Sequence, residues 1–458
     1  MEEITFRLGG KMHSKIKLSL WLIGPYLIAS HPAVADIYTL EQAIDYTLAH
    51  NLDLEAAREQ TRTATEHTAV AQGARRPQVD LRYLLRRSDN PLDAFADKLN
   101  TRSVNPATDF TGNALNQPGS SSLSATELSV HLPVYTGGKL RAALRNAEDS
   151  ERATRLQTER VRDLTTFRTR QAYLAAQAAT EAVAIADDAV QAARGHAQTT
   201  ASLVRQGRIV VSDRMTAELN LAATESAREQ ALNRQRRSLD ELKLVMGMPL
   251  DDTLEIQPWQ PIADAPVLAP LVESEHRALA QRKDLQANQY RVNAGQARVD
   301  VARAAFKPQV SVVAASSWYD DSVSLDNRST SIMGVISMNL YSGGQVSHEV
   351  AAARSQSTEN DIQLRNQERV IRNEVRSAYS NLTEALARYR IAAQNADKAR
   401  ETVRLVRQRY GEGRTILIDV LMSERVLVET RNEQLASAYS IAVNQAALHL
   451  AEGMPDHP

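Results

Sequence analysis

The residue types that usually carry catalytic or metal chemistry occur in this chain without the spacing that such chemistry needs. The ten histidines are scattered with no metal-ligand spacing, and no phosphate-binding glycine loop or recognisable Ser-His-Asp set is present. A lone histidine such as His131 is better explained as a structural or exposed side chain. The absence of cysteine excludes disulfides, thiolate metal sites and cysteine lipidation. The sequence therefore predicts no enzyme, no metal site and no cofactor.

Composition favours long helices over compact domains. The 458 residues carry a net charge of −1, so nothing indicates a nucleic-acid partner held by bulk electrostatics. Aromatic residues make up only 5% of the chain, which is low for a compact core. Alanine, glutamine, glutamate and arginine are plentiful, and this composition suits long helices.

The longest helical pattern runs from Gly137 to Gly247 and contains no proline. Its interior glycines are Gly138, Gly195 and Gly207. Proline is the strongest helix breaker and glycine the next, so two very long helices folded back at Gly207 are predicted. At a rise of ~1.5 Å per residue, about 65 residues before the fold would span on the order of 100 Å.

This pattern occurs twice, at an offset of 206 residues. Three motifs recur at that offset. Tyr-x-Gly-Gly at 135–138 and 341–344 marks the start of the hairpin, and Gly-Met-Pro at 247–249 and 453–455 marks its end. Gly-Arg at 207–208 and 413–414, with an aspartate six residues after each glycine, marks the fold-back. Three matches at one offset indicate an internal duplication.

Residues 1–35 have the features of a secretory signal peptide. A basic segment precedes the apolar core Leu18–Ala29, and an Ala-Val-Ala cleavage site follows it. Translation could start at Met1 or Met12. The apolar core contains Pro25 and is shorter than the ~20 residues of a spanning helix. Cleavage and export are therefore favoured over an uncleaved membrane anchor.

The rest of the chain divides into two repeats and a linker. Residues 36–249 are expected to form the first repeat, with a helical start, two strands joined by a long external loop, and a long helical hairpin. Thr39 followed by Gln42 is a capping-box pattern for the first helix. The proline-rich linker 250–271 is expected to be an extended crossover. Residues 272–455 form the second repeat.

Each repeat carries two segments in which apolar residues alternate with polar ones. In the first copy the alternating positions are Val79, Leu81, Tyr83 and Leu85 in one segment, and Leu128, Val130, Leu132 and Val134 in the other. In the second copy they are Val310, Val312, Ala314, Ser316 and Trp318 in one segment, and Ile332, Gly334, Ile336, Met338 and Leu340 in the other. This period predicts strands of about nine to eleven residues, the length that a tilted strand needs to cross a bilayer. Two soluble hairpins on helical stalks are the alternative.

The polar stretch Arg86–Ser122 between the first two strands is predicted to be a long loop outside the cell. Helix-to-strand junctions with Pro-Gln-Val recur at an offset of 231, whereas the strand-to-helix motif recurs at 206. The first copy therefore carries 25 extra residues, which are rich in Asn, Asp, Pro and Ser.

Four strands cannot close a membrane barrel alone. An open sheet edge in lipid leaves backbone groups unpaired at several kcal/mol each, and bacterial barrels need at least about eight strands. Two copies would supply eight strands and three would supply twelve. An oligomer around a common axis is required, with its helices continuing the barrel as a tube.

On these motifs the chain resembles the TolC family of outer membrane efflux proteins. The resemblance covers residues 38–455 and rests on the Thr-Leu-Glu-Gln-Ala opening at 39–43 and the paired junction and fold-back motifs. It implies an α+β membrane protein: a homotrimer whose four strands per chain form a 12-stranded outer-membrane β-barrel, continued by a long α-helical coiled-coil tunnel in the periplasm of a Gram-negative bacterium. It also implies a periplasmic adaptor protein and an inner-membrane transporter of RND or ABC type as partners.

The resemblance further places the two fold-backs at the periplasmic tip. It implies adaptor docking at Gly207, Arg208, Gly413 and Arg414, and an entrance gate made by Asp213, Tyr410 and Asp419. Asp419 would form a three-fold carboxylate ring that favours cations. Met422 stands where some members have a second acidic residue, and arginine follows both glycines where members often have an apolar residue. Without a cysteine, the chain falls outside the lipidated branch of the family.

The predicted function is an outer-membrane exit duct for efflux or type I secretion, which passes substrates from the inner-membrane transporter to the outside. The alternative is an exported coiled-coil stalk with a structural or adhesive role. Because the duct is shared and the inner-membrane pump selects, the sequence names no cargo.

Overall fold

The computed structural model describes residues 37–260 and 268–454. The predicted signal peptide, the middle of the predicted linker and Pro455 at the end of the second repeat lie outside these described residues.

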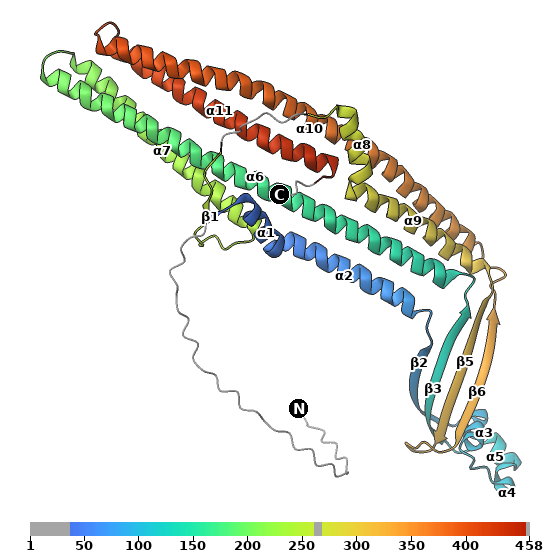
Figure 1. Cartoon of the computed structure of the whole chain (residues 1–458). Helices are drawn as coiled ribbons and strands as arrows, with labels where there is room; N and C mark the ends of the chain where they lie inside the picture. The colour runs from blue at the N-terminus through green and yellow to red at the C-terminus, as the bar shows by residue number, and fades with distance from the viewer. Residues whose placement is uncertain (1–36, 261–267, 455–458) are drawn as a thin grey trace, which may run out of the picture. The chain divides into compact units, whose positions relative to one another are not determined.

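The helical part repeats one arrangement (Figure 1). Its elements are α1 (Leu40–His50), α2 (Leu52–Gly73), α6 (Lys139–Arg205) and α7 (Val211–Met246) in the first copy, and α8 (Leu271–Gln281), α9 (Lys283–Arg303), the 3-10 turn η1 (Ala304–Phe306), α10 (Gln345–Gly411) and α11 (Leu417–Glu452) in the second. Helices α6 and α10 each have 67 residues, and α7 and α11 each have 36. The long hairpin that the sequence predicts is therefore present in both copies.

Helix ends follow their local sequence. At the start of α1 the Gln42 backbone N–H donates to Thr39 Oγ1 at 3.2 Å, and the Thr39 N–H donates to Gln42 Oε1 at 2.9 Å, which completes the predicted capping box. Two apolar clusters hold the helices together. One joins α1, α6 and α7 around Tyr173 and Leu242, and the other joins α8 to α11 around Ile371 and Ile441.

The glycines that end α7 and α11 lie against the backbone of the preceding helical pair. Gly247 has φ +75°, and a Cβ there would lie 2.7 Å from the carbonyl oxygen of His50. Gly453 has φ +76°, and its Cβ would lie 2.9 Å from the backbone nitrogen of Arg282. Gly207 at the fold-back has a similar φ of +71° but nothing within 4 Å of a Cβ.

We therefore expect Gly247→Ala to destabilise the protein more than Gly207→Ala. The left-handed conformation costs an alanine about 1–2 kcal/mol at either site, and the backbone clash at Gly247 adds roughly 1–3 kcal/mol. Thermal unfolding of the detergent-solubilised variants, followed by circular dichroism, measures the difference. Equal melting temperatures would show that the close approach to His50 does not matter.

A four-stranded antiparallel sheet lies at one end of the hairpins, and the hairpin turns lie at the other (Figure 1). Its strands β2 (Gln78–Ser88), β3 (Ser121–Tyr135), β5 (Gln309–Asp320) and β6 (Arg328–Ser337) are arranged in the order β2-β3-β5-β6. A short parallel pair, β1 (Ile37–Tyr38) with β4 (Glu255–Ile256), ties the start of the first repeat to the segment after α7.

The strand lengths differ from the prediction at two places. β3 has 15 residues because its serine-rich start continues to pair with β2, from Ser121 opposite Ser88 onward, although it shows no apolar alternation. β6 ends at Ser337, and the predicted continuation to Leu340 is wrong. Ser337 pairs with Gln309, the first residue of β5, so the residues that follow have no partner strand.

The stretch Arg86–Ser122, predicted as a long external loop, contains regular secondary structure. The ends of this stretch belong to β2 and β3, and its middle folds into α3 (Pro91–Asn100), α4 (Pro106–Asp109) and α5 (Gly112–Asn116). Asn90, Asn105 and Thr111 cap the three helices through their side chains, and proline follows both asparagines at the first helical position. The residues that suggested a loop are helix-start signals.

Candidate functional site

The sheet has one face that is apolar along its whole central length. In an antiparallel sheet, paired residues point to the same side and successive residues to opposite sides. The register puts the following side chains on one side, called the apolar face: Val79, Leu81, Tyr83, Leu85, Leu128, Val130, Leu132, Val310, Val312, Ala314, Trp318, Ile332 and Ile336. The alternating positions that lie within the regular register of the four strands thus share a face.

The opposite side of the sheet, called the polar face, carries charged and hydroxyl side chains. Asp80, Arg82 and Arg86 of β2 and Glu127 and His131 of β3 lie on it, and Arg82 is directly opposite Glu127. A sheet with one face for lipid and one for water has this distribution.

Aromatic residues border the apolar face at two levels. Tyr83 and Trp318 share one row through Thr126, and Tyr135 lies beside Val310 near the other end. The rows of Val310 and Trp318 are eight residues apart along β5, or about 26 Å at ~3.3 Å per residue. That height matches the ~25 Å apolar band, flanked by aromatic girdles, of outer-membrane barrels.

Residues 37–260 and 268–454 leave the apolar face largely uncovered. Leu81, Ile332 and Ile336 are 72%, 78% and 76% exposed, which is far more than an aqueous surface normally tolerates in one patch. The outer edges of β2 and β6 have no partner strand in the described part of the chain. The sheet is therefore complete only in an apolar environment and beside further strands.

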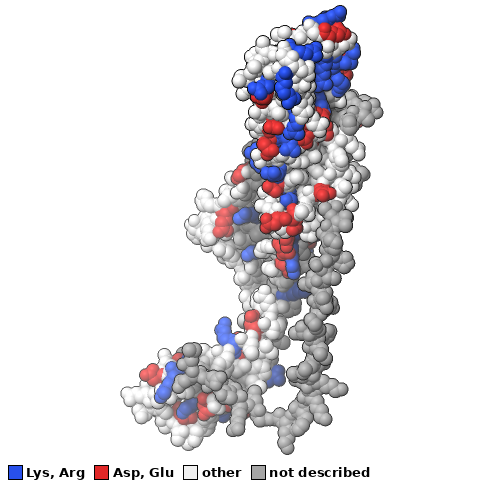
Figure 2. All heavy atoms as spheres, turned by 90° about the vertical axis from the view of Figure 1, so that its left-hand side faces the viewer, with Lys and Arg blue, Asp and Glu red and all other residues white. Residues whose placement is uncertain are grey.

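The two fold-backs have the same geometry. Gly207 donates its N–H to the Val204 carbonyl and Gly413 donates to the Tyr410 carbonyl, and both glycines have φ +71°. At the first turn, none of the ion pairs of the described residues involves Arg208. At the second, Arg414 pairs with Glu412 at 3.1 Å. Figure 2 shows several Lys and Arg side chains close together at the end where these turns lie.

The hairpin tips meet around Tyr410. Its ring packs in a small cluster with Ala197 of α6, Ala217 of α7 and Leu417 of α11. Burial and the nearby charge of Asp213 raise the pKa of Tyr410. Asp419 instead accepts a hydrogen bond from the Thr415 hydroxyl of its own turn. The structure thus brings Tyr410 and Asp213 together, whereas the hydrogen bond that Asp419 accepts lies within its own turn.

A polar cluster near the tips was missed by sequence reasoning. Glu424 of α11 accepts hydrogen bonds from His196 Nε2 of α6 at 2.7 Å and from Arg407 Nε of α10 at 2.9 Å. Burial would raise the pKa of Glu424, but these two partners hold it below its usual range. The cluster ties the first hairpin to the second. Since His196 and Glu424 are 228 residues apart in the sequence, no local signal could have found it.

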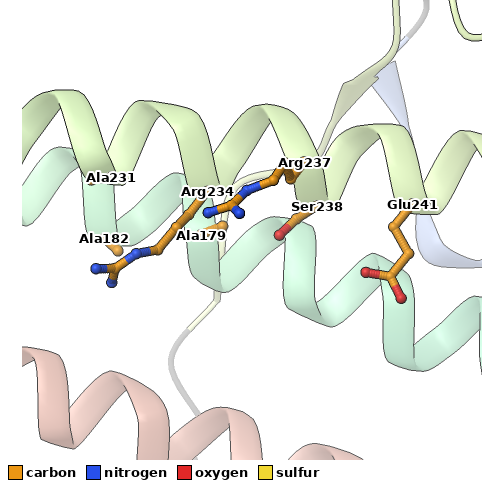
Figure 3. Close-up of a pocket in the computed structure, with 7 residues that line it drawn as sticks. All are labelled: Ala179, Ala182, Ala231, Arg234, Arg237, Ser238 and Glu241. Carbon is orange, nitrogen blue, oxygen red and sulfur yellow. The ribbon is translucent and has the colours of Figure 1, made fainter.

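A groove of about 320 Å³ lies between α6 and α7 (Figure 3). Arg234 and Arg237 of α7 border it together with Ala179 and Ala182 of α6, and Glu241 lies further along α7. The small alanines leave the space that the arginines border. Neither arginine takes part in any ion pair of residues 37–260 and 268–454, and with Glu241 they make the lining of the groove polar along α7.

Two further properties concern the described residues, 37–260 and 268–454. None of their helices combines the length and apolar character needed to cross a membrane. They contain no group of three or more His, Asp or Glu side chains placed to hold a metal ion.

An exposed apolar band on a four-stranded sheet, joined to 67-residue helices, defines the class of outer-membrane channels with a helical extension. The comparisons agree: the family model described as Outer membrane efflux protein matches residues 43–248 and 275–454. The chain belongs to this family, and the resemblance and fold class predicted from the sequence are confirmed. It is therefore an outer-membrane protein whose helices form the periplasmic part.

Curated relatives include proteins named for protease secretion and for cation efflux. The alkaline protease secretion protein AprF of Pseudomonas aeruginosa is 24% identical over 249 residues, which are 52% of this chain and 50% of the relative. The cation efflux system protein CusC of Escherichia coli is 26% identical over 334 residues, 68% of this chain and 69% of the relative. The match to the secretion proteins thus spans about half of their length.

Solved structures share the fold over almost the whole chain. A CusC structure superimposes with a TM-score of 0.78 at 18% identity, covering 92% of this chain and 93% of that one. The open state of the MtrE outer membrane channel of Neisseria gonorrhoeae gives a TM-score of 0.74 at 16% identity, covering 91% and 89%.

Proposed function

We propose that three copies of the chain form an outer-membrane exit duct of a tripartite efflux or type I secretion system. The proposal depends on the sheet: among the described residues nothing covers its apolar face, and its two outer edges have no partner strand. Unpaired edges are costly in lipid. Three copies supply twelve strands, above the minimum of about eight that a bacterial barrel needs.

Native mass measurement in detergent, combined with chemical crosslinking, tests the assembly. A trimer that runs as a heat-modifiable oligomer and fractionates with the outer membrane is the expected result. A stable monomer or dimer would contradict the duct and favour the exported stalk as the function.

The partners proposed are a periplasmic adaptor and an inner-membrane transporter of RND or ABC type. Related proteins are named for protease secretion and for cation efflux, so both kinds of system are candidates for this duct. We assign the choice of cargo to the inner-membrane transporter. Because the relatives are channel proteins, we propose no catalytic role for this chain.

The adaptor is proposed to dock at the two fold-backs, around Gly207, Arg208, Gly413 and Arg414. Arg208 and Arg414 are exposed there, and basic tips favour an adaptor with acidic residues at its own tip. We expect the charge reversals Arg208→Glu and Arg414→Glu together to weaken adaptor binding about tenfold at low salt and less at high salt. Surface plasmon resonance at two ionic strengths measures this. Binding that is equally weak or strong at both would mean that charge does not select the adaptor.

The entrance gate is proposed to consist of Tyr410, Asp213 and Asp419. Tyr410 fills the cluster between the two hairpins, and Asp419 braces the second turn through Thr415. The double replacement of Tyr410 and Asp419 by alanine should loosen the hairpin tips of all three copies. We expect it to raise single-channel conductance in planar bilayers severalfold and to increase the entry of large antibiotics into cells. Arg431→Ala, which removes a partly exposed ion pair with Asp188 further from the turns, is the control. Unchanged conductance in a correctly inserted double variant would place the constriction elsewhere.

A further inference from the structure

The segment between β2 and β3 folds back onto the sheet at the end away from the helical hairpins (Figure 1). Residues 89–120, which hold α3, α4 and α5, are called the cap. Arg86 donates to Asp93 of α3 at 3.1 Å and forms an ion pair with Asp97, which is only 3% exposed. Arg86 lies on the polar face, opposite Leu123. Helix α3 is therefore anchored on the polar side of the sheet.

Further contacts place α3 on the same side. The Ser121 hydroxyl donates to Asp97 Oδ2 at 2.8 Å, and the Ser88 hydroxyl donates to Asp93 Oδ2 at 2.9 Å. Leu123 of β3 and Ser317 of β5 point to the polar face and are only 4% and 8% exposed. Helix α3 lies against both of these strands.

The cap is a folded unit that reaches across the sheet. Lys98 pairs with Asp109, and Phe95 meets Phe110 edge to face with 5.7 Å between ring centroids. At its far side, Arg102 donates to the Arg328 carbonyl at the start of β6 at 3.1 Å. The cap is thus fixed to β2 and β3 and also to β6, at the end of the sheet away from the helical hairpins (Figure 1).

Helix α3 has two opposite sides. Ala94 and Asp97, three residues apart, are buried against the sheet. Leu92 and Leu99 are seven residues apart, so they lie nearly above one another on the helix. They point almost opposite to Ala94 and Asp97 and are 77% and 54% exposed. Two leucines therefore project away from the polar face of the sheet.

We propose that the cap lies inside the outer mouth of the barrel and that three caps meet through Leu92 and Leu99 around the axis, narrowing the exit. This inference rests on the proposed trimeric duct. If the apolar face meets lipid, the polar face lines the lumen, and a helix fixed to the polar face is inside. Its far side then points to the axis, where the only surfaces available to the two leucines are those of the other two copies.

The dimensions of the barrel agree with this arrangement. Twelve strands spaced ~4.8 Å apart and tilted by ~40° have a perimeter of about 75 Å, hence a backbone diameter of about 24 Å. Three helices, each about 10 Å across with their side chains, need a circle of roughly 22 Å, which is nearly the whole backbone diameter and more than the wall's inward side chains leave free, so they fit only at the rim of the barrel. Three copies of α3 are therefore enough to close most of the mouth, and burial of Leu92 and Leu99 among them would stabilise the closed arrangement.

Single cysteines test the meeting of the caps, because the natural chain contains none. We expect Leu92→Cys to form disulfide-linked dimers of the chain in outer membranes under mild oxidant. The control is Val323→Cys, in the β5–β6 turn at the same end of the sheet and 82% exposed, which should stay unlinked. A trimer on native gels in which Leu92→Cys does not link would overturn the cap proposal alone. Loss of the trimer in the unmodified chain would instead overturn the duct.

Single-channel conductance tests whether the caps narrow the exit. Deleting residues 90–117 should leave membrane insertion and trimer formation intact, since the deleted part contains no strand. In the Tyr410 and Asp419 double variant, whose tips no longer limit the current, the deletion should raise conductance roughly twofold or more, because the narrowest section sets conduction. Arg86→Ala, which releases α3 from the wall, should raise it in part. Unchanged conductance in both variants with the trimer intact would show that the cap does not narrow the exit.

Discussion

Ile332→Arg is expected to abolish insertion into the outer membrane. Ile332 lies on the apolar face opposite Ala314, midway between the Val310 and Trp318 rows, and its side chain is 78% exposed. An arginine at the bilayer midplane of a barrel costs roughly 2–4 kcal/mol per chain. In a trimer the three copies together lose on the order of 6–12 kcal/mol, which is comparable to the whole stability of an ordinary domain.

The neighbouring residue is a matched control. Met333 has a similar size and is also exposed, but it pairs with Val313 on the polar face. Met333→Arg should therefore insert and assemble like the natural protein. Membrane fractionation and the amount of heat-modifiable oligomer compare the two variants. Equal insertion of both would mean that the apolar face does not meet lipid, and it would also remove the basis for placing the cap in the lumen.

The strand positions and the helical hairpins could be predicted from the sequence. Alternation alone assigned Ile332, Leu81 and Leu128 to apolar positions, because the period of a strand is two and one phase covers its length. The helical hairpins could be predicted equally well, because the duplication repeats the motifs at their ends at one offset. In both cases a local rule applies to every residue of the element.

The polar clusters could not be predicted in this way. The contact between His196 and Glu424, 228 residues apart, depends on the relative rotation of two long helices. A helix drifts by ~20° per heptad against a strict seven-residue repeat, so the facing side after many turns is not fixed by pattern alone. The cap was missed for a related reason. Its helices have no more than 10 residues and depend on tertiary anchors such as Arg86 with Asp97, because isolated helices of that length are marginal in water.

Arg282 is expected to be the charged residue whose loss destabilises the helical part most. It lies between α8 and α9, is 2% exposed, and donates from Nε and Nη2 to both carboxylate oxygens of Asp284 at 3.0 and 2.6 Å. It also pairs with Glu374 of α10. Removing one partner of a buried ion pair typically costs 3–5 kcal/mol because the remaining charges are left unpaired. Arg282→Met should therefore lower the free energy of unfolding by about 3–5 kcal/mol.

The duplication supplies the control. Asp53 and Arg168 occupy the positions of Asp284 and Glu374 in the first repeat, where they form a 3.8 Å pair with side chains 77% and 60% exposed. Arg168→Met should cost no more than about 1 kcal/mol, as is usual for exposed pairs. Denaturant unfolding of the two variants in detergent measures the difference, and similar losses would show that burial does not distinguish the two repeats.

Acid should weaken the ion pair between Arg282 and Asp284 and so destabilise the folded protein. Burial would raise the pKa of Asp284, but its bonds to Arg282 hold that pKa below the usual range. A carboxylate with a depressed pKa in the folded state contributes stability that is present above its unfolded value of about 3.9 and is lost as the pH falls through its folded pKa. The natural protein should thus lose more stability between neutral pH and strongly acidic pH than Arg282→Met, in which Asp284 has already lost its main partner. Parallel acid-unfolding curves for the two proteins would show that Arg282 does not set the protonation of Asp284.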